Sequence, residues 1–294
     1  MTKPLFERVA IIGFGLIGSS LGRAIRAHKL ARTLVACDRS DQALATIARL
    51  RLADAATPVA ADAAKDADLV VIAVPLGAYA EVANQIAPVL KPGAIVSDVG
   101  SVKGTIVRDL SPILPPHIHL VPGHPVAGTE NSGPESGFET LFEGRWCILT
   151  PPPGTDPAAI AKVTDLWLAC GAMVETMDAA HHDKVLAITS HVPHLIAYTI
   201  VGTASNLEED AKSEVIKFSA SGFRDFTRIA ASDPTMWRDI FLNNKEAVLE
   251  MLQRLTEDLT ALQRAIRRGE GDMLFERFTR TREIRRRIID AHQA

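Results

Sequence analysis

Three stretches of the sequence carry residue types suited to moving a proton or binding an anion. Residues 97–103 (Ser-Asp-Val-Gly-Ser-Val-Lys) contain Ser101, and residues 123–128 (Gly-His-Pro-Val-Ala-Gly) contain His124. A third stretch, Phe-Arg-Asp-Phe-Thr-Arg-Ile-Ala, sets Arg228 among apolar neighbours. Histidine titrates near neutral pH, and oxidation of an alcohol by hydride transfer needs a base for the hydroxyl proton. These stretches therefore predict a base and an anion-binding arginine.

Each of these side chains also has a purely structural interpretation. His124 stands between a glycine and a proline on a predicted loop, a poor place for a packed core histidine, so we interpret it as the base. Ser101 could hydrogen-bond the same hydroxyl group or merely cap a helix. Arg228 could bind a carboxylate ligand through paired hydrogen bonds, or it could form a buried ion pair with Asp225 or Asp233.

A glycine-rich run lies close to the N-terminus and consists of Gly13, Phe14, Gly15, Leu16, Ile17 and Gly18. Its G-x-G-x-x-G spacing leaves a predicted strand and enters a predicted helix. In such a run the first glycine permits a tight turn, the second admits the pyrophosphate and the third lets helix and strand pack closely. The helix N-terminus offers N–H groups and a positive dipole end to phosphates. We predict a dinucleotide site, with a strand–helix turn that binds no nucleotide as the alternative.

The acidic residue that such a site requires is Asp38, at the end of the next predicted strand and 20 positions after Gly18. Its carboxylate would accept hydrogen bonds from the ribose hydroxyls and repel a 2′-phosphate, which favours NAD over NADP. Arg39 follows directly and could pair with such a phosphate, so how strict the preference is stays open. The expected cofactor-binding set is completed by Val74, Pro75 and Ser101.

The elements that must position these residues alternate between strand and helix in the first half of the chain. Apolar runs rich in Val and Ile are typical of strands buried on both faces of a parallel sheet, and they occupy residues 9–12, 33–37, 68–74 and 93–97. Amphipathic stretches such as residues 17–28 and 41–50 lie between them. This alternation predicts an α/β fold with a Rossmann-type doubly wound parallel sheet. Further elements are expected at residues 119–121, 146–149 and 173–177 (strands) and 157–170 (helix).

The second half of the chain has a different pattern of apolar residues, because no strand pattern appears after Asp178. We predict a dinucleotide-binding domain at residues 1–179 and an all-helical domain for substrate binding and dimerisation at residues 180–294. Long helices are expected at residues 182–202 and 234–268. Asp233 supplies a capping side chain before a proline, which marks the start of the second of these helices.

An apolar seam with alternating spacings of four and three runs along that second helix and comprises Val248, Leu252, Leu255, Leu259, Leu262 and Ile266. Such a seam needs a partner helix. One small helical domain does not bury it easily, so we predict a homodimer through the C-terminal half.

Composition excludes several other classes of protein. Of 294 residues, 47% are apolar and 23% charged, and the net charge of -3 gives no reason to expect nucleic-acid binding. No apolar run approaches the roughly 20 residues that cross a bilayer, and the first strand begins too early for a secretory leader, so we expect a cytoplasmic protein without a membrane span. The arginines at residues 282–287 are interpreted as a solvated helix face. The cysteines are interpreted as small buried apolar side chains; they are Cys37, Cys147 and Cys170.

Taken together and in order, the motifs resemble one family. They are the glycine run, Ser-Asp-x-x-Ser-x-Lys (97–103), His-Pro-x-x-Gly-x-Glu (124–130), His-x-Pro-His (191–194) and Phe-Arg-Asp-Phe-Thr-Arg-Ile-Ala (223–230). The set looks like the prephenate/arogenate (cyclohexadienyl) dehydrogenase family of tyrosine biosynthesis, and the likeness covers nearly the whole chain. It implies that NAD takes a hydride from C4 of a cyclohexadienol while the ring carboxylate leaves as carbon dioxide and the ring becomes aromatic.

The resemblance also implies roles for individual residues. His124 would polarise or deprotonate the C4 hydroxyl with help from Ser101, and Arg228 would bind a substrate carboxylate. Because His124 must be neutral to accept a proton, activity should fall at acid pH. The other substrate-binding positions implied are His191, His194, Trp237 and Asp183. The sequence does not decide between prephenate and arogenate, whether tyrosine inhibits, or which of the histidine pair contacts the substrate side chain.

Other interpretations stay open at this point. A related two-domain NAD(P) dehydrogenase of the β-hydroxyacid type would need a catalytic lysine early in the helical domain, for which Lys184 is available. A nucleotide-sensing module without turnover would need the glycines alone. Lys103 could meet a phosphate or carboxylate, but we interpret it as an exposed loop lysine. His181 and His182 do not share a helix face, so we expect no metal site there.

Overall fold

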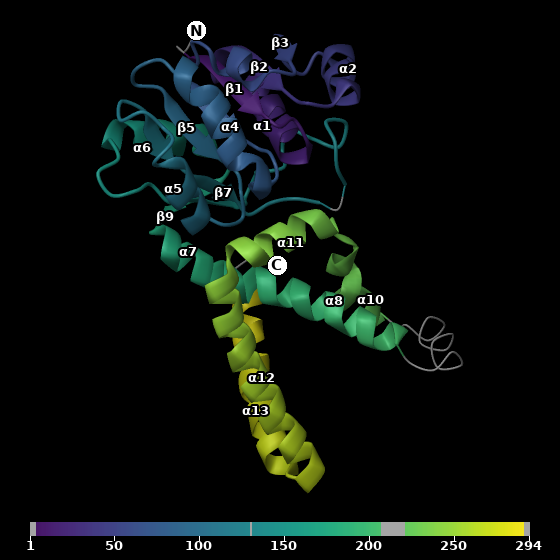
Figure 1. The fold of residues 1–294 in the computed structure, drawn as a ribbon. Helices are drawn as coiled ribbons and strands as arrows, with labels where there is room; N and C mark the ends of the chain where they lie inside the picture. Colours follow the sequence, from purple (N-terminus) through teal and green to yellow (C-terminus); the bar gives the residue numbers. More distant parts are fainter. Residues whose placement is uncertain (1–3, 130, 207–220, 291–294) are drawn as a thin grey trace. The chain divides into compact units, whose positions relative to one another are not determined.

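The computed structural model describes residues 4–129, 131–206 and 221–290 (Figure 1). The chain forms two compact units, residues 1–245 and residues 246–294. The domain boundary predicted near residue 179 lies inside the first unit and stays a prediction.

A six-stranded parallel sheet forms the core of the first unit, in the order β3-β2-β1-β4-β5-β6. Its strands are β1 (Phe6–Ile12), β2 (Ala31–Cys37), β3 (Ala55–Thr57), β4 (Leu69–Ile72), β5 (Ile95–Asp98) and β6 (His119–Val121). The predicted Rossmann-type doubly wound sheet is therefore confirmed. Strand β4 is buried along its whole length, which explains why it reads as an unbroken apolar run.

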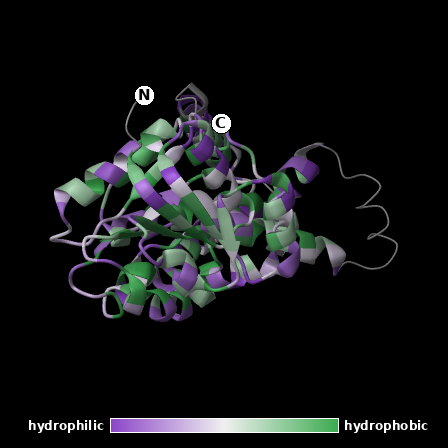
Figure 2. Ribbon diagram, turned by 90° about the horizontal axis from the view of Figure 1, so that it is seen from above, coloured by the Kyte–Doolittle hydropathy of each residue, from purple (hydrophilic) through white to green (hydrophobic). Residues whose placement is uncertain are grey.

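Helices cover both faces of this sheet. They are α1 (Leu16–Ala27), α2 (Asp41–Leu50), α3 (Ala60–Ala64), α4 (Tyr79–Ile86), α5 (Gly104–Leu110) and α6 (Pro157–Ala169), with short 3-10 turns η1 (Leu76–Ala78) and η2 (Ala87–Val89). Helices α1 and α6 contribute to one hydrophobic cluster, while α3, α4 and α5 contribute to the other. Figure 2 shows hydrophilic and hydrophobic residues mixed along these helices, as amphipathic helices packed on a sheet require.

A second, three-stranded sheet holds the predicted base. It consists of β7 (Gly123–Pro125), β8 (Trp146–Leu149) and β9 (Met173–Thr176), with β7 antiparallel and β9 parallel to β8. His124 pairs with Ile148 and is only 6% exposed. The prediction that His124 lies on a loop was wrong. Three residues are too few to show a strand pattern, and the pairing partner lies more than 20 residues away along the chain.

The first unit ends with a run of helices: α7 (Ala179–Leu186), a π-helical turn η3 (Ala187–His191), α8 (Val192–Ser205), α10 (Ser221–Thr227), a 3-10 turn η4 (Arg228–Ala231) and α11 (Pro234–Asn243). The single helix predicted at residues 182–202 is interrupted by the π-helical turn, beside a proline that lacks an N–H group. Helix α11 begins as predicted, since the Asp233 carboxylate accepts hydrogen bonds from the amides of Thr235 and Met236. It ends at Asn243, so the helix predicted at residues 234–268 is two helices.

One helical stretch, Ala179–Ser205, is long and apolar enough to cross a membrane by length and composition. The expectation that no apolar run approaches this length was therefore too strict. The same stretch carries the buried side chains of His182, Asp183 and His191, which bind other parts of the first unit through hydrogen bonds. We interpret it as a helix of a folded globular unit.

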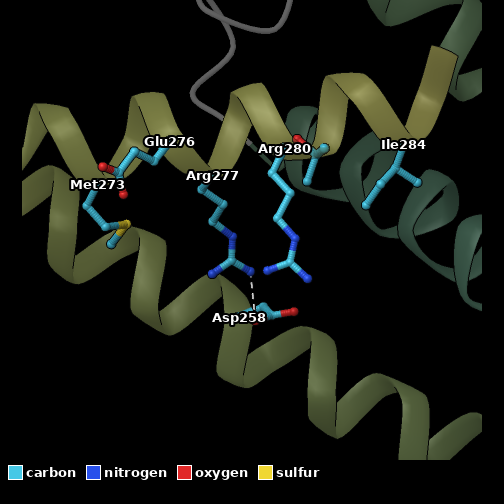
Figure 3. Close-up of a pocket in the computed structure, with 7 residues that line it drawn as sticks. Asp258, Met273, Glu276, Arg277, Arg280 and Ile284 are labelled. Atoms are coloured by element: carbon cyan, nitrogen blue, oxygen red, sulfur yellow. Dashed lines mark ion pairs between the residues drawn. The ribbon is translucent and has the colours of Figure 1, made fainter.

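Helix α12 (Lys245–Arg268) begins at the last residue of the first unit and belongs otherwise to the second unit, together with α13 (Gly271–Asp290). The two helices lie side by side and are joined by an ion pair between Asp258 and Arg277 at 2.7 Å (Figure 3). The predicted seam of α12 is only partly covered, because Leu259 is 56% and Ile266 67% exposed. On α13, Phe275 is also 72% exposed. These large apolar side chains leave this unit with uncovered hydrophobic surface.

Candidate active site

The glycine run forms a tight connection between β1 and α1. Gly13 has φ of +90°, and a Cβ atom there would stand 2.5 Å from the Ala73 carbonyl oxygen. A Cβ on Gly18 would collide with the Gly13 carbonyl group, whereas nothing lies within 4 Å of the Cβ position of Gly15. The loop is therefore closed on its protein side and open at Gly15, which fits the backbone approach that a pyrophosphate needs.

Asp38 lies beside this loop, as the nucleotide prediction requires. Its carboxylate accepts hydrogen bonds from the Phe14 amide (3.0 Å) and the Ser40 amide (2.9 Å). Val74 lies against Gly13, while Arg39 and Pro75 are exposed. Leu16 and Ile17 are half-buried and pack on the core. The residues of this edge fit a dinucleotide, and their individual contacts with it stay predictions.

His124 belongs to a chain of three buried side chains. Its Nδ1 atom lies 2.8 Å from Nε2 of His182, and Nδ1 of His182 lies 2.8 Å from the Asp183 carboxylate. A carboxylate only accepts, so Nδ1 of His182 donates to it and Nε2 of His182 is left to accept. The His124 Nδ1–H group therefore donates to His182. This leaves the lone pair on Nε2 of His124 available to take a proton, the arrangement that a general base needs.

Asp183 is anchored by the start of α5. Its carboxylate accepts hydrogen bonds from the backbone amides of Lys103 and Gly104, both at 2.8 Å. The resemblance implied that Asp183 is a substrate-binding position. In the structure its carboxylate binds protein groups, and its position orients His182 and, through it, His124.

Lys103 is fully buried, so the interpretation of an exposed loop lysine was wrong. Its Nζ atom lies 2.5 Å from the buried Asp98 carboxylate and donates to the Gly123 carbonyl oxygen at 2.7 Å. Asp98 also accepts hydrogen bonds from the Gly123 amide and the Tyr79 hydroxyl group. Both backbone groups of the residue before His124 are thus held by one buried ion pair.

This environment keeps the imidazoles neutral. Burial lowers the pKa of His124 well below its usual value, and the neighbouring His182, Lys103 and His191 lower it further. Burial also lowers the pKa of His182, although the hydrogen bond to Asp183 opposes this. At neutral pH His124 is therefore uncharged and able to accept a proton.

A second group of side chains surrounds Trp237 on α11. The ring of His194 stacks on Trp237 with ring centres 3.6 Å apart, and the His191 ring meets it edge-on at 6.1 Å. Val102 belongs to the same buried hydrophobic cluster as Trp237 and Ile240. Because Val102 follows Ser101 directly, this cluster brings the loop after β5 and the helical part of the unit to one place.

Arg228 is the first residue of the turn η4 and is exposed. It lies close enough to His194 that its charge, after burial, contributes to lowering the pKa of that histidine. In the described part of the chain no ion pair joins Arg228 to Asp225 or Asp233, the alternative that the sequence left open. Ser101 is half-buried.

Two participants were missed by the sequence analysis: His182 and Tyr79. His182 was considered only as half of a metal pair with His181, although its neighbour Asp183 could have suggested an orienting carboxylate.

Over the described residues no group of three or more His, Cys, Asp or Glu side chains could hold a metal ion. Glu130, which ends one motif of the resemblance, lies outside the described residues. The cysteines at positions 37, 147 and 170 are free and buried.

Comparison with known proteins agrees with this geometry. The prephenate dehydrogenase nucleotide-binding domain matches residues 21–176, and the prephenate dehydrogenase dimerization domain matches residues 178–280. A cyclohexadienyl dehydrogenase from Zymomonas mobilis is 43% identical over 288 residues, which cover 98% of each chain.

Two solved structures are similar over almost the whole chain. Prephenate dehydrogenase from Aquifex aeolicus, in complex with hydroxyphenyl propionate and NAD+, has a TM-score of 0.90 at 34% identity and covers 98% of this chain and 99% of its own. Arogenate dehydrogenase from Synechocystis has a TM-score of 0.81 at 26% identity, over 95% and 98% of the two chains. The chain therefore belongs to the family of NAD-dependent prephenate, arogenate and cyclohexadienyl dehydrogenases.

Proposed function

We propose that this protein catalyses the NAD-dependent oxidative decarboxylation of prephenate, arogenate or both, a step of tyrosine biosynthesis. NAD, when bound along the glycine loop beside Asp38, supplies the hydride acceptor. The single observation that carries the proposal is the buried hydrogen-bonded chain from Nδ1 of His124 through His182 to Asp183, because its direction leaves Nε2 of His124 unprotonated.

The chain's own residues account for the remaining steps. Nε2 of His124 takes the proton of the C4 hydroxyl group as the hydride leaves C4, and Asp183 stabilises the resulting charge through His182. The electron pair of the bond to the ring carboxylate then enters the ring, and carbon dioxide departs. The ring becomes aromatic, and the proton held by His124 can return to the phenolate oxygen.

The substrate carries a carboxylate at its side-chain end as well as on the ring. Arg228 is our candidate for binding one of these carboxylates, and Ser101 for a hydrogen bond to the C4 hydroxyl group. We propose that the side chain of the substrate is surrounded by His191, His194 and Trp237. The stacking of His194 on Trp237 and its proximity to Arg228 support this assignment.

The two alternative functions receive less support. A dehydrogenase of the β-hydroxyacid type would use Lys184, which is exposed, whereas His124 and His182 are buried and hydrogen-bonded to each other. A nucleotide-sensing module has no use for an imidazole chain that ends in a free lone pair. Both alternatives also leave the match to both prephenate dehydrogenase domains without a reason.

The direct test supplies NAD with prephenate and with arogenate in parallel and follows the absorbance of the reduced nicotinamide. Turnover with at least one of the two supports the proposal, and the ratio of the two kcat/KM values gives the substrate preference. Absence of reduced nicotinamide with both substrates, from a protein that binds NAD, would refute it. Repeating the assay with NADP measures how strictly Asp38 discriminates.

We further propose that the protein forms a homodimer through the second half of the chain and acts in the cytoplasm. We also propose that its domains are residues 1–179 and residues 180–294. The exposed Leu259, Ile266 and Phe275 support such an interface, as does the match to a dimerization domain at residues 178–280. The family matches meet between residues 176 and 178, which supports a boundary near 179. Sedimentation as a monomer at micromolar concentration would refute the dimer.

A further inference from the structure

Asn244 lies at the end of α11 and is only 5% exposed. Its side-chain nitrogen Nδ2 lies 2.8 Å from the backbone carbonyl oxygen of Asp183 and 3.1 Å from Nδ1 of His191. One amide group therefore joins Asp183, the residue that anchors the His124 chain, to a third buried histidine. No motif of the sequence drew attention to Asn244.

The chemistry of these partners fixes the direction of both hydrogen bonds. A backbone carbonyl oxygen only accepts, so the group of Asn244 that faces Asp183 must be its NH2 group. The second hydrogen of that NH2 group points to Nδ1 of His191, and Nδ1 must therefore be the accepting, unprotonated nitrogen. In neutral imidazole the other nitrogen then carries the hydrogen. His191 is consequently an Nε2–H donor.

That donor has no protein acceptor. His191 is fully buried, and across the described residues its Nε2 atom has no hydrogen-bond partner. An unpaired buried N–H group is unfavourable, and an acceptor atom of a bound ligand would satisfy it. The groups around the ring are Trp237, edge-on at 6.1 Å, and His182, His194 and Asp183, which act on it electrostatically. Asn244 connects His191 to Asp183, the residue at which the hydrogen-bonded chain of His124 ends, so the donor belongs to the same site.

We propose that Asn244 is a positioning residue that locks His191 as an Nε2–H donor for an acceptor oxygen on the side chain of the substrate. Prephenate and arogenate both carry carboxylate oxygens there, and prephenate adds a keto oxygen. The identification of the ligand rests on the proposed function. The locked hydrogen position does not, because it follows from the contacts of Asn244 alone.

The test combines tautomer measurement with kinetics. Two-bond 1H–15N correlation spectra of protein labelled at histidine distinguish protonated from unprotonated ring nitrogens, and loss of one signal set in H191Q identifies His191. We expect Nδ1 unprotonated and Nε2 protonated in the unliganded protein near pH 8. In N244D the new carboxylate accepts from His191, so the hydrogen moves to Nδ1 and the donor is lost.

The kinetic consequence is specific. N244D should raise KM for prephenate about tenfold or more, the effect of one lost hydrogen bond to a charged or carbonyl oxygen, and change kcat less. The matched control is N243D. The neighbouring Asn243 donates to the Asp239 carbonyl oxygen within α11, so its kinetic constants should stay within about twofold of the wild type and the His191 signals should not move.

The outcomes separate the two proposals. A wild-type spectrum with the hydrogen of His191 on Nδ1 overturns the inference even where N244D fails to fold, because that spectrum needs no variant. An unchanged His191 tautomer or unchanged KM in folded N244D overturns it as well. If the tautomer shifts as expected but the wild type oxidises neither substrate, the proposed function fails while the role of Asn244 in fixing the tautomer stands.

Discussion

Replacing Lys103 by methionine tests how the base is held in place. Methionine keeps most of the side-chain length and removes the ammonium group, which leaves the carboxylate of Asp98 buried without a counter-charge. Breaking a buried ion pair in this way costs about 3–5 kcal/mol. Asp98 keeps hydrogen bonds from Tyr79 and from the amides of Gly100 and Gly123, so we expect the lower end, about 3 kcal/mol.

The assay is urea unfolding followed by circular dichroism, compared for wild type, K103M and the double variant D98N/K103M. The double variant removes both charges, so it should recover part of the stability that K103M loses. Activity adds a second measurement. The charge of Lys103 lowers the pKa of His124, so in K103M the acid limb of the kcat/KM profile should move to higher pH.

Two results would refute this reasoning. A free energy of unfolding for K103M within about 0.5 kcal/mol of the wild type would mean that the ion pair is solvated or dispensable. An acid limb that stays in place, or that moves to lower pH, would mean that Lys103 does not act on the base.

R228Q should chiefly raise KM in steady-state kinetics, and a fall in kcat alone would contradict a binding role. D183N should reduce kcat with substrate affinity little changed, because the carboxylate that orients His182 is lost; an unchanged kcat would contradict the orienting chain. Burial lowers the pKa of His191 to about 4, so between about pH 6.5 and pH 4 the unfolded state binds a proton on this histidine and the folded state does not. The free energy of unfolding in urea titrations should therefore fall as the pH drops, by up to about 3 kcal/mol from this group. A free energy of unfolding that does not change between pH 7 and pH 5 would contradict this prediction. I266E should shift the sedimentation coefficient towards the monomer, and an unchanged dimer would place the interface elsewhere.

The sequence predicted the large sheet well, because strands buried on both faces are continuous apolar runs whose type does not depend on distant partners. The prediction failed where contacts between residues far apart in the sequence decide the secondary structure. Strand β7 exists because residues 123–125 find β8, and the π-helical turn at Ala187–His191 leaves no periodic pattern of its own. The break after Asn243 was missed for a similar reason, since the apolar pattern continues across it.

The sequence predicted which residue types make up the candidate site, but it did not predict the environment of each side chain. Asp38 directly follows β2, and His124 lies just beyond the end of β6, at the edge where a parallel sheet gathers its functional groups. Lys103 was misread because a lysine is rarely buried without a partner, and its partner Asp98 reveals itself only in three dimensions. His182 was set aside because neighbouring residues do not share a helix face, yet it needs only Asp183 on one side and His124 on the other.

In the proposed reaction neutral His124, oriented by His182, takes the hydroxyl proton while the hydride leaves. The most direct test of this step is single-turnover formation of reduced nicotinamide by H124N, with NAD and prephenate or arogenate at saturating concentration. We expect the rate to fall about 10²- to 10⁴-fold while the substrate dissociation constant changes little. A rate within about tenfold of the wild type, or a loss confined to substrate binding, would contradict the account.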